Sequence, residues 1–302
     1  MRGNRIACHA IAWAWSNTKL TDVFSEIASL GFDGIELPSE RLLSAEVSWS
    51  SLKQALNVSS IPIISVYQTA RLGNKDRCVR EYEFKRCLAL IDILQELQVR
   101  YLIIGDPPTA FNDAQTILAE ILDKLGAISN SKGVNLCYHP HFGSVVETPE
   151  QIDTLMSMTS IRNLGLCLDT GHICWGGSDP SQVIRKFANR IAYIHFKDVR
   201  KRHLTPFEKL AEVARATCMQ VDRGRKLKYM GSVFLQPTGF HIVEIGLGEI
   251  DFGSVLSELS AVNYEGWITI ELDTWLMSPG QSLGRCLSKV DELYCRVKSE
   301  LN

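Results

Sequence analysis

The chain alternates short apolar runs with longer segments of helical periodicity, and it does so eight times. The runs cover residues 5–13, 33–38, 61–70, 99–107, 134–141, 163–172, 191–198 and 266–273. They are apolar throughout rather than at every second position, which is typical of parallel strands covered on both faces. Eight strand–helix units predict an α/β protein with a closed (β/α)8 barrel, a TIM barrel, more economically than an open doubly wound sheet.

Segments with apolar residues at helical spacing lie between these runs. They cover residues 20–31, 76–98, 112–132, 148–158, 178–188, 251–264 and 282–298, and residues 48–58 form a weaker candidate. The fourth segment begins with Thr148 followed by Pro149, an order typical of a helix N-terminus. A length of 302 residues is ordinary for one barrel. We therefore expect a single domain over residues 1–302.

One segment interrupts the alternation. Residues 199–250 separate the seventh predicted strand from its helix, whereas a loop between a strand and a helix commonly has about 2–6 residues. The segment contains a helix-like part at 207–220, a basic run at 223–228 and an apolar stretch at 229–246. We expect it at the C-terminal rim of the barrel. There it would be either a lid or substrate wall, or a surface insertion that contacts a neighbouring subunit.

Composition and charge argue against several classes of partner. A net charge of −2 disfavours nucleic acid, and the chain has no apolar run of about 18 residues that could span a membrane. The basic N-terminal stretch lacks a small-residue cleavage site, so we do not expect a signal peptide. The nine cysteines form no CxxC pair, and several lie within apolar runs. Reduced thiols and a cytoplasmic location are therefore the simpler expectation.

Polar residues gather where the predicted strands end, which is where a TIM barrel builds its active site. The candidates are, in chain order, His9, Trp13, Glu36, His139, His141, Glu147, Asp169, His172, His195, Lys197 and Glu271. Each residue alone would more often cap a turn or form a hydrogen bond in the core. However, the last four strands all end in such residues, and this favours a functional site. We expect His9, Trp13, Glu36, His141 and Glu147 to line a substrate pocket.

Four of these residues could bind a metal ion together. His139, Asp169, His195 and Glu271 would supply two imidazoles and two carboxylates from four strand ends. Such a set suits Mn²⁺, which we expect, or Co²⁺, Mg²⁺, Fe²⁺ or Zn²⁺, and the absence of thiolates argues against a closed structural zinc site. Glu147 follows His139 by eight residues and is the alternative fourth ligand.

The expected chemistry follows from the charge of the cation. A divalent cation bound to a substrate carbonyl lowers the pKa of the adjacent C–H bond, so a neighbouring base can remove that proton. We place His172, Lys197 and His139 in the catalytic set. His172 is three positions after Asp169 and could reach a substrate oxygen beside the metal, and Lys197 could donate a proton to a leaving hydroxyl. The alternative for Lys197 is a buried ion pair with Asp198 or Glu271.

Several motifs carry a resemblance to a known family. These are CYHPHFGSVVETPEQ, GLCLDTGHICWGG, YIHFKDV, GLGEIDFGSVL and GWITIELD. They resemble the motifs of the xylose isomerase-like TIM barrel superfamily, the sugar phosphate isomerase/epimerase group, and their order and spacing are preserved from about residue 130 onward. Within the group, YHPH combined with DTGH and HFKD is most similar to the inosose dehydratase-like enzymes. The resemblance covers almost the whole chain.

The resemblance implies a metal-dependent lyase that acts on a keto-cyclitol or keto-sugar by α-proton abstraction and β-elimination. The epimerases of the group bind metal with Glu, Asp, His and Glu. Asp169, His195 and Glu271 match the last three, and His139 stands near the position of the first. This departure disfavours an epimerase, which uses two facing carboxylates, although a sugar isomerase or ketose 3-epimerase remains the enzymatic alternative.

Another class of function is also open from the sequence. A sugar-binding protein could keep this fold without catalysing a reaction, because a fold alone does not establish a reaction. In either case the expected partner is a small polyol or keto-sugar. A homodimer is possible by analogy with other barrels.

Overall fold

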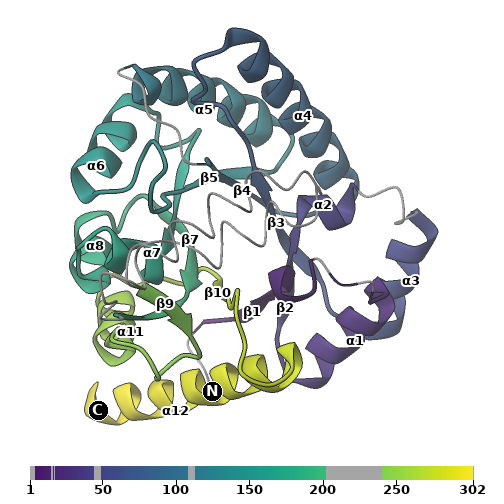
Figure 1. Ribbon diagram of the computed structural model, residues 1–302, viewed down its shortest axis with the longest axis vertical. Helices are drawn as coiled ribbons and strands as arrows, with labels where there is room; N and C mark the ends of the chain where they lie inside the picture. Colours follow the sequence, from purple (N-terminus) through teal and green to yellow (C-terminus); the bar gives the residue numbers. More distant parts are fainter. Residues whose placement is uncertain are drawn as a thin grey trace, which may run out of the picture.

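The structure is a computed structural model that describes residues 4–14, 16, 18–43, 49–107, 113–201 and 240–301. Its centre is a closed barrel of parallel strands in the order β1-β10-β7-β6-β5-β4-β3-β2 (Figure 1). The strands are β1 Ile6–His9, β2 Gly34–Pro38, β3 Ile63–Thr69, β4 Tyr101–Gly105, β5 Asn135–His139, β6 Gly165–Asp169, β7 Ile191–Phe196 and β10 Ile268–Ile270. Each lies within one of the predicted runs, so the predicted (β/α)8 barrel is confirmed.

Helices surround the barrel (Figure 1). The longer ones are α1 Leu20–Ser29, α3 Trp49–Ser59, α4 Arg77–Glu96, α5 Ala114–Ser131, α6 Pro149–Met158, α8 Pro180–Lys186, α11 Phe252–Ala261 and α12 Pro279–Leu301. Short helices η1 Ala10–Trp13, α2 Ser39–Leu42 and α7 Thr170–Trp175 follow β1, β2 and β6 directly. Within the described residues, no helix has the length and apolar content needed to cross a membrane.

Two predicted strands end earlier than the apolar pattern suggested. The first stops at His9, because its Nδ1 accepts a hydrogen bond from the N–H of Ile11 and begins η1. The sixth stops at Asp169, because its side chain accepts from the N–H of His172 and begins α7. In both cases a side chain at the strand end satisfies a free N–H group of the following helix. The DTGH stretch is therefore the start of a helix rather than a simple turn.

The predicted start of α6 is confirmed in detail. Thr148 accepts a hydrogen bond from the N–H of Gln151, and the side chain of Gln151 accepts from the N–H of Thr148. Pro149 stands at the first helical position, where its missing N–H costs nothing. This reciprocal arrangement is a capping box.

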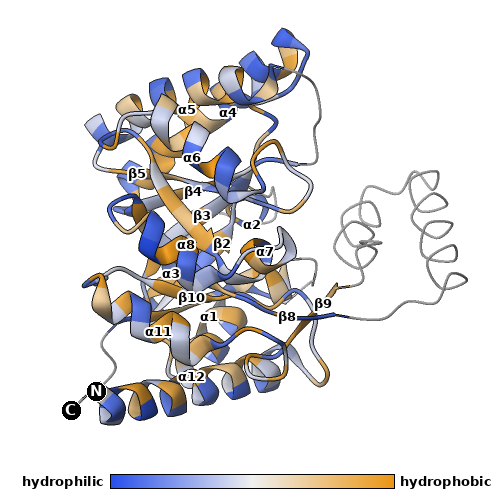
Figure 2. Cartoon of the chain, turned by 90° about the vertical axis from the view of Figure 1, so that its left-hand side faces the viewer, coloured by the Kyte–Doolittle hydropathy of each residue, from blue (hydrophilic) through white to orange (hydrophobic). Residues whose placement is uncertain are grey.

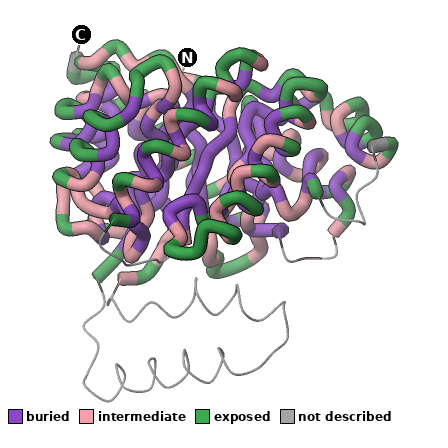
Figure 3. Tube along the Cα trace, turned by 90° about the horizontal axis from the view of Figure 1, so that it is seen from above, coloured by how far each residue is buried: buried purple, intermediate pink, exposed green. Residues whose placement is uncertain are grey.

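Two apolar layers hold the barrel together. The larger one lies between the strands and the helices, and Figure 3 shows the buried strands enclosed by helices with exposed outer turns. The smaller one fills the barrel interior and contains one residue from each of several strands, including Cys137, Cys167 and Tyr193. Because strand side chains alternate, the residues two positions further along these strands face the same interior. Those residues are His139, Asp169 and His195.

The predicted interruption after β7 is present in the structure. β8 Asp198–Lys201 pairs with β9 Phe240–Val243 as an antiparallel ribbon. β8 lies beside α7 (Figure 2). Residues 202–239 lie outside the described residues. The predicted helix-like part at 207–220, the basic run at 223–228 and most of the apolar stretch at 229–246 therefore stay predictions.

Asp198 joins the two ends of this segment. Its Oδ2 accepts hydrogen bonds from the N–H groups of Gly246 and Gly248, at 2.8 and 2.9 Å, and its Oδ1 accepts from those of Val199 and Ile250, at 2.9 and 3.3 Å. A Cβ at position 248 would lie 2.0 Å from Oδ1. Glycine at this position therefore allows the backbone to approach the carboxylate closely.

Candidate metal centre and active site

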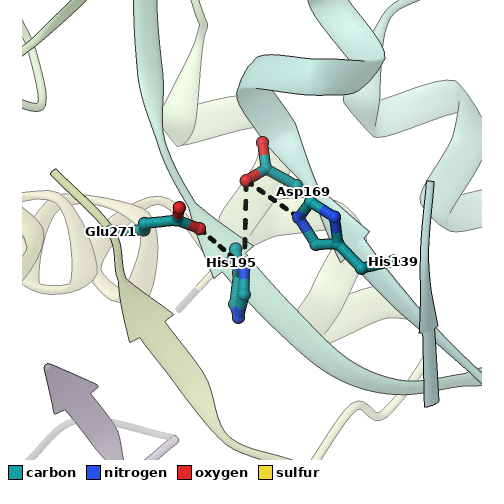
Figure 4. Close-up of side chains that lie close together, drawn as sticks. All are labelled: His139, Asp169, His195 and Glu271. Atoms are coloured by element: carbon teal, nitrogen blue, oxygen red, sulfur yellow. Dashed lines mark hydrogen bonds and ion pairs between the residues drawn. The ribbon is translucent and has the colours of Figure 1, made fainter. Parts of the chain in front are cut away.

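Four strand ends bring two histidines and two acids together at the rim of the barrel. His139 ends β5, Asp169 ends β6, His195 lies near the end of β7 and Glu271 follows β10 (Figure 4). Each offers one ligand atom, and these atoms lie within 4.8 Å of one another. All four side chains are buried. The set predicted from sequence is thus gathered in one place.

Glu147, the alternative fourth ligand, lies outside this group. Its Oε2 accepts a hydrogen bond from the N–H of Gly143 at 3.0 Å, within the loop that follows β5. His139 instead places Nε2 3.4 Å from Oδ2 of Asp169. The geometry therefore favours His139 over Glu147 as the fourth ligand.

The donor atoms of the group fit a divalent cation. Nδ1 of His195 lies 2.8 Å from Oε2 of Glu271 and 3.8 Å from Oδ2 of Asp169. Despite the short distance, neither Nδ1 nor Oε2 has a hydrogen-bond partner. Buried polar atoms without partners are costly, and a cation between them would satisfy both. Two imidazole nitrogens and two carboxylate oxygens suit Mn²⁺, Fe²⁺, Co²⁺, Zn²⁺ or Mg²⁺.

Lys197 places a buried ammonium beside the group. Its Nζ lies 2.8 Å from Oε1 of Glu271, 3.0 Å from Oδ2 of Asp273 and 3.5 Å from Oδ2 of Asp169. Burial alone would lower the pKa of Lys197, but the carboxylates of Asp273, Glu271 and Asp169 outweigh it and raise this pKa well above its usual value. Lys197 is therefore charged at neutral pH. The sequence suggested Asp198 or Glu271 as the ion-pair partner of Lys197. Glu271 is confirmed. Asp198 is wrong, because it accepts hydrogen bonds from backbone N–H groups instead.

The backbone around Lys197 is held in place by α7. Thr170 Oγ1 donates to the carbonyl of Lys197 at 2.8 Å and accepts from its N–H at 3.0 Å. Gly171 leaves room for the lysine stem, because a Cβ there would lie 2.8 Å from Cγ of Lys197. The Thr-Gly pair of DTGH thus positions the lysine as well as starting the helix.

Two further histidines lie next to this ammonium. The rings of His141 and His172 are 3.8 Å apart between centroids, and Nε2 of His172 is 3.3 Å from Nζ of Lys197. Burial, with His141 and then Lys197 adding to it, lowers the pKa of His172 well below its usual value. Burial, followed by His139 and Lys197, lowers the pKa of His141 to about 4. The lowered pKa values keep both imidazoles neutral at neutral pH.

Three of the expected pocket residues lie deeper than the sequence suggested. His9 and Glu36 are 1% and 0% exposed, and Oε1 of Glu36 lies 2.9 Å from Nε2 of His195. Burial alone would raise the pKa of Glu36, but His195 and His9 lower it to about 2. Trp13 is buried within the outer apolar layer.

Two residues outside the predicted set contribute to the site. Asp273 pairs with Lys197, and burial raises its pKa to about 6. The ring of Tyr67 lies 5.5 Å from that of His139 and 5.7 Å from that of His9. Both follow the strand-end pattern, since Tyr67 lies near the end of β3 and Asp273 lies three residues after β10. Their position near a strand end is therefore the sequence signal by which both residues could have been predicted.

The fold and the group at its rim define a TIM-barrel protein with a candidate metal centre. The model of the xylose isomerase-like TIM barrel family matches residues 24–283. The chain belongs to this family, as its motifs predicted.

Individual proteins are similar to the chain over most of its length. It is 30% identical to inosose dehydratase of Clostridium perfringens (strain 13 / Type A), and the match covers 86% of this chain and 87% of that protein. Solved structures share the fold, and two of them illustrate it. L-ribulose 3-epimerase has a TM-score of 0.75 at 17% identity, covering 99% of this chain and 97% of that one. The IOLI protein with a binding zinc atom has a TM-score of 0.72 at 17% identity, covering 97% and 99%. The similarity to inosose dehydratase shows that the chain is an enzyme, which sets aside the non-catalytic alternative.

Proposed function

We propose that this chain is a divalent-metal-dependent lyase that removes water from a keto-cyclitol or keto-sugar. The observation that carries the proposal is the buried group of His139, Asp169, His195 and Glu271, with the ammonium of Lys197 2.8 Å from Glu271. The similarity to a protein named inosose dehydratase supports both the substrate class and the type of reaction.

The four side chains of the group would hold the cation, and Mn²⁺ is the occupant we propose. Bound there, a divalent cation would draw electron density from a substrate carbonyl and make the adjacent C–H bond more acidic. His139 was also a candidate base from the sequence. Because His139 belongs to the ligand group and its Nε2 lies 3.4 Å from Oδ2 of Asp169, we assign it to the metal.

Two side chains of the protein would move the protons. His172, neutral and buried, accepts the proton from the carbon next to the carbonyl, and the C–H electron pair forms the new C=C bond. Lys197 donates a proton to the β-hydroxyl, and the C–O bond breaks to release water. Nε2 of His172 lies 3.3 Å from Nζ of Lys197. The proton gained by the histidine can therefore return to the lysine, and the enzyme is restored for the next turnover.

The test combines product analysis with loss of the ligands. The protein is incubated with Mn²⁺ and 2-keto-inositol in deuterated water, and we expect an unsaturated product that has lost one water, detected by mass spectrometry. Asp169→Ala and Glu271→Ala should each lose both bound metal and turnover. Asp153→Ala, on the exposed side of α6, is the matched control and should keep both.

Two outcomes would contradict the proposal. A deuterium-labelled sugar that has lost no water would identify an isomerase or epimerase instead of a lyase. Full activity of either alanine variant after chelator treatment would show that the group holds no essential metal.

The single domain over residues 1–302, the cytoplasmic location and the homodimer stay predictions from the sequence.

A further inference from the structure

Glu36 lies at the base of the candidate metal centre, fully buried in β2. Its Oε1 is 3.1 Å from Nε2 of His9 and 2.9 Å from Nε2 of His195. Its Oε2 accepts a hydrogen bond from Oγ of Ser65 at 2.6 Å. With no surface exposed, this carboxylate is available to its protein neighbours rather than to a substrate.

The hydrogen bonds of His9 show which of its ring nitrogens faces Glu36 with a proton. Nδ1 of His9 accepts from the N–H of Ile11 at 3.0 Å, so Nδ1 carries no proton. The ring proton of His9 is therefore on Nε2, which faces Glu36. The contact at 3.1 Å is an electrostatic attraction between this N–H group and the carboxylate, because Oε1 accepts no hydrogen bond.

Hydroxyl groups donate toward Glu36 from the side of Ser65. Ser65 uses its only hydroxyl proton toward Glu36, so it must accept from the hydroxyl of Tyr193, 2.7 Å away. Tyr193 in turn must accept from Thr269, 2.5 Å away. A chain of hydroxyl groups from β10, β7 and β3 thus ends in a single donor to Glu36, the hydroxyl of Ser65.

The remaining contact then fixes the orientation of the His195 ring. Oε1 of Glu36 accepts no hydrogen bond, so its contact with Nε2 of His195 at 2.9 Å is an electrostatic one. With Nε2 turned toward Glu36, the other ring nitrogen, Nδ1, points to the ligand group. Nδ1 is the atom 2.8 Å from Glu271 and 3.8 Å from Asp169.

We propose that Glu36, oriented by His9 and Ser65, is a positioning residue that holds His195 with Nδ1 toward the metal. This inference rests on the proposed metal centre and adds to it the residue that selects the ligand atom. It also replaces the expectation that His9 and Glu36 line a substrate pocket. Carboxylates that hold a metal-binding histidine in this way commonly contribute about 10–100-fold to metal affinity.

Zinc binding to the purified metal-free protein tests the proposal. The dissociation constant is measured by competition with a chromophoric chelator. Glu36→Ala removes the acceptor and should weaken zinc binding by about 10–100-fold. Glu36→Gln keeps an acceptor oxygen but loses the charge, so it should recover part of this loss. If the alanine variant fails to fold, the glutamine variant still tests the effect of the charge.

A matched control separates positioning from general damage. Glu83 is also a buried carboxylate, but it pairs with Arg71 and Arg86 on the outer side of the barrel. Glu83→Gln removes a buried negative charge elsewhere, as Glu36→Gln does in the site. It should leave the zinc dissociation constant within about twofold of the wild-type value.

Nitrogen NMR of the histidine rings gives a second reading that a merely structural role would not change. In the zinc-loaded wild-type protein, His195 should show zinc on Nδ1 and a slowly exchanging proton on Nε2. In Glu36→Gln that proton should exchange faster. Unchanged zinc affinity in folded Glu36→Ala and Glu36→Gln, or zinc on Nε2 of His195, would overturn the inference alone. Failure of the wild-type protein to bind zinc, cobalt or manganese would overturn the metal centre and this inference with it.

Discussion

Replacing Asp106 by asparagine should stabilise the protein, and increasingly so as the pH rises. Asp106 directly follows β4, is only 3% exposed, and neither carboxyl oxygen has a hydrogen-bond partner. Burial, with a smaller contribution from the nearby carboxylate of Glu83, raises the pKa of Asp106 from 3.8 to about 8. Asparagine has nearly the same shape and carries no charge at any pH.

The magnitude follows from the size of this pKa shift. A shift of about four pH units, at 1.36 kcal/mol for each unit, corresponds to roughly 5 kcal/mol. The pKa is higher in the folded protein, so between pH 4 and pH 8 the folded state binds more protons than the unfolded chain. Its stability therefore falls as the pH rises through this range, by about 1.4 kcal/mol per pH unit from this group alone. Above pH 8 the contribution stays constant.

The assay is urea unfolding of the wild-type protein and Asp106→Asn at a series of pH values from 4 to 9. The variant should match the wild-type free energy of unfolding at pH 4, exceed it by ~3 kcal/mol at pH 6 and exceed it by ~5 kcal/mol at pH 8. Asp153→Asn, at an exposed position, is the control and should differ from wild type by less than about 0.5 kcal/mol throughout. A difference for Asp106→Asn that does not change with pH would refute the reasoning.

Two further substitutions test the packing and the chemistry. Gly126→Ala, in the interior of α5, should destabilise the protein by about 1–3 kcal/mol in urea unfolding, although alanine is the better helix former. A Cβ there would lie 1.9 Å from the backbone oxygen of Asn163, and equal or greater stability would contradict this. Lys197→Met should lower kcat by at least about 100-fold while metal analysis still finds the cation bound, because it removes the proton donor. A kcat within tenfold of wild type would exclude that role.

The strand ends could be predicted from sequence because the two patterns that mark them, an apolar run and the polar residue after it, are local. An apolar run shows where a strand is, and the polar residue at its end shows what reaches the rim. His139, Asp169, His195 and Glu271 were all found in this way, since parallel strands of a closed barrel end at one rim. Knowing the order of the strands was not necessary for this step.

What could not be predicted depends on contacts between strands and on hydrogen-bond direction. His9 ends β1 and Glu36 lies in the middle of β2, and nothing in their local sequence distinguishes a pocket residue from one beneath His195. That distinction depends on the height of each residue along the barrel axis relative to the apolar interior. This height is set by the closed barrel and not by the local sequence. Asp198 and Asp273 show the same limit. Both lie near Lys197, but one folds back to bind backbone N–H groups and the other forms an ion pair with it.

The four hydrogen bonds to Asp198 have a consequence for how this barrel can vary. They join the two ends of the segment between β7 and α11. The positions of the neighbouring strands and helices are therefore set by these two ends and not by the length of the segment. Lengthening a loop whose ends are already held together adds little closure entropy. The residues between Lys201 and Phe240 could therefore be exchanged or resized while Lys197, next to Asp198, keeps its place. The joint thus makes the position of Lys197, the proposed proton donor, independent of the length of that segment.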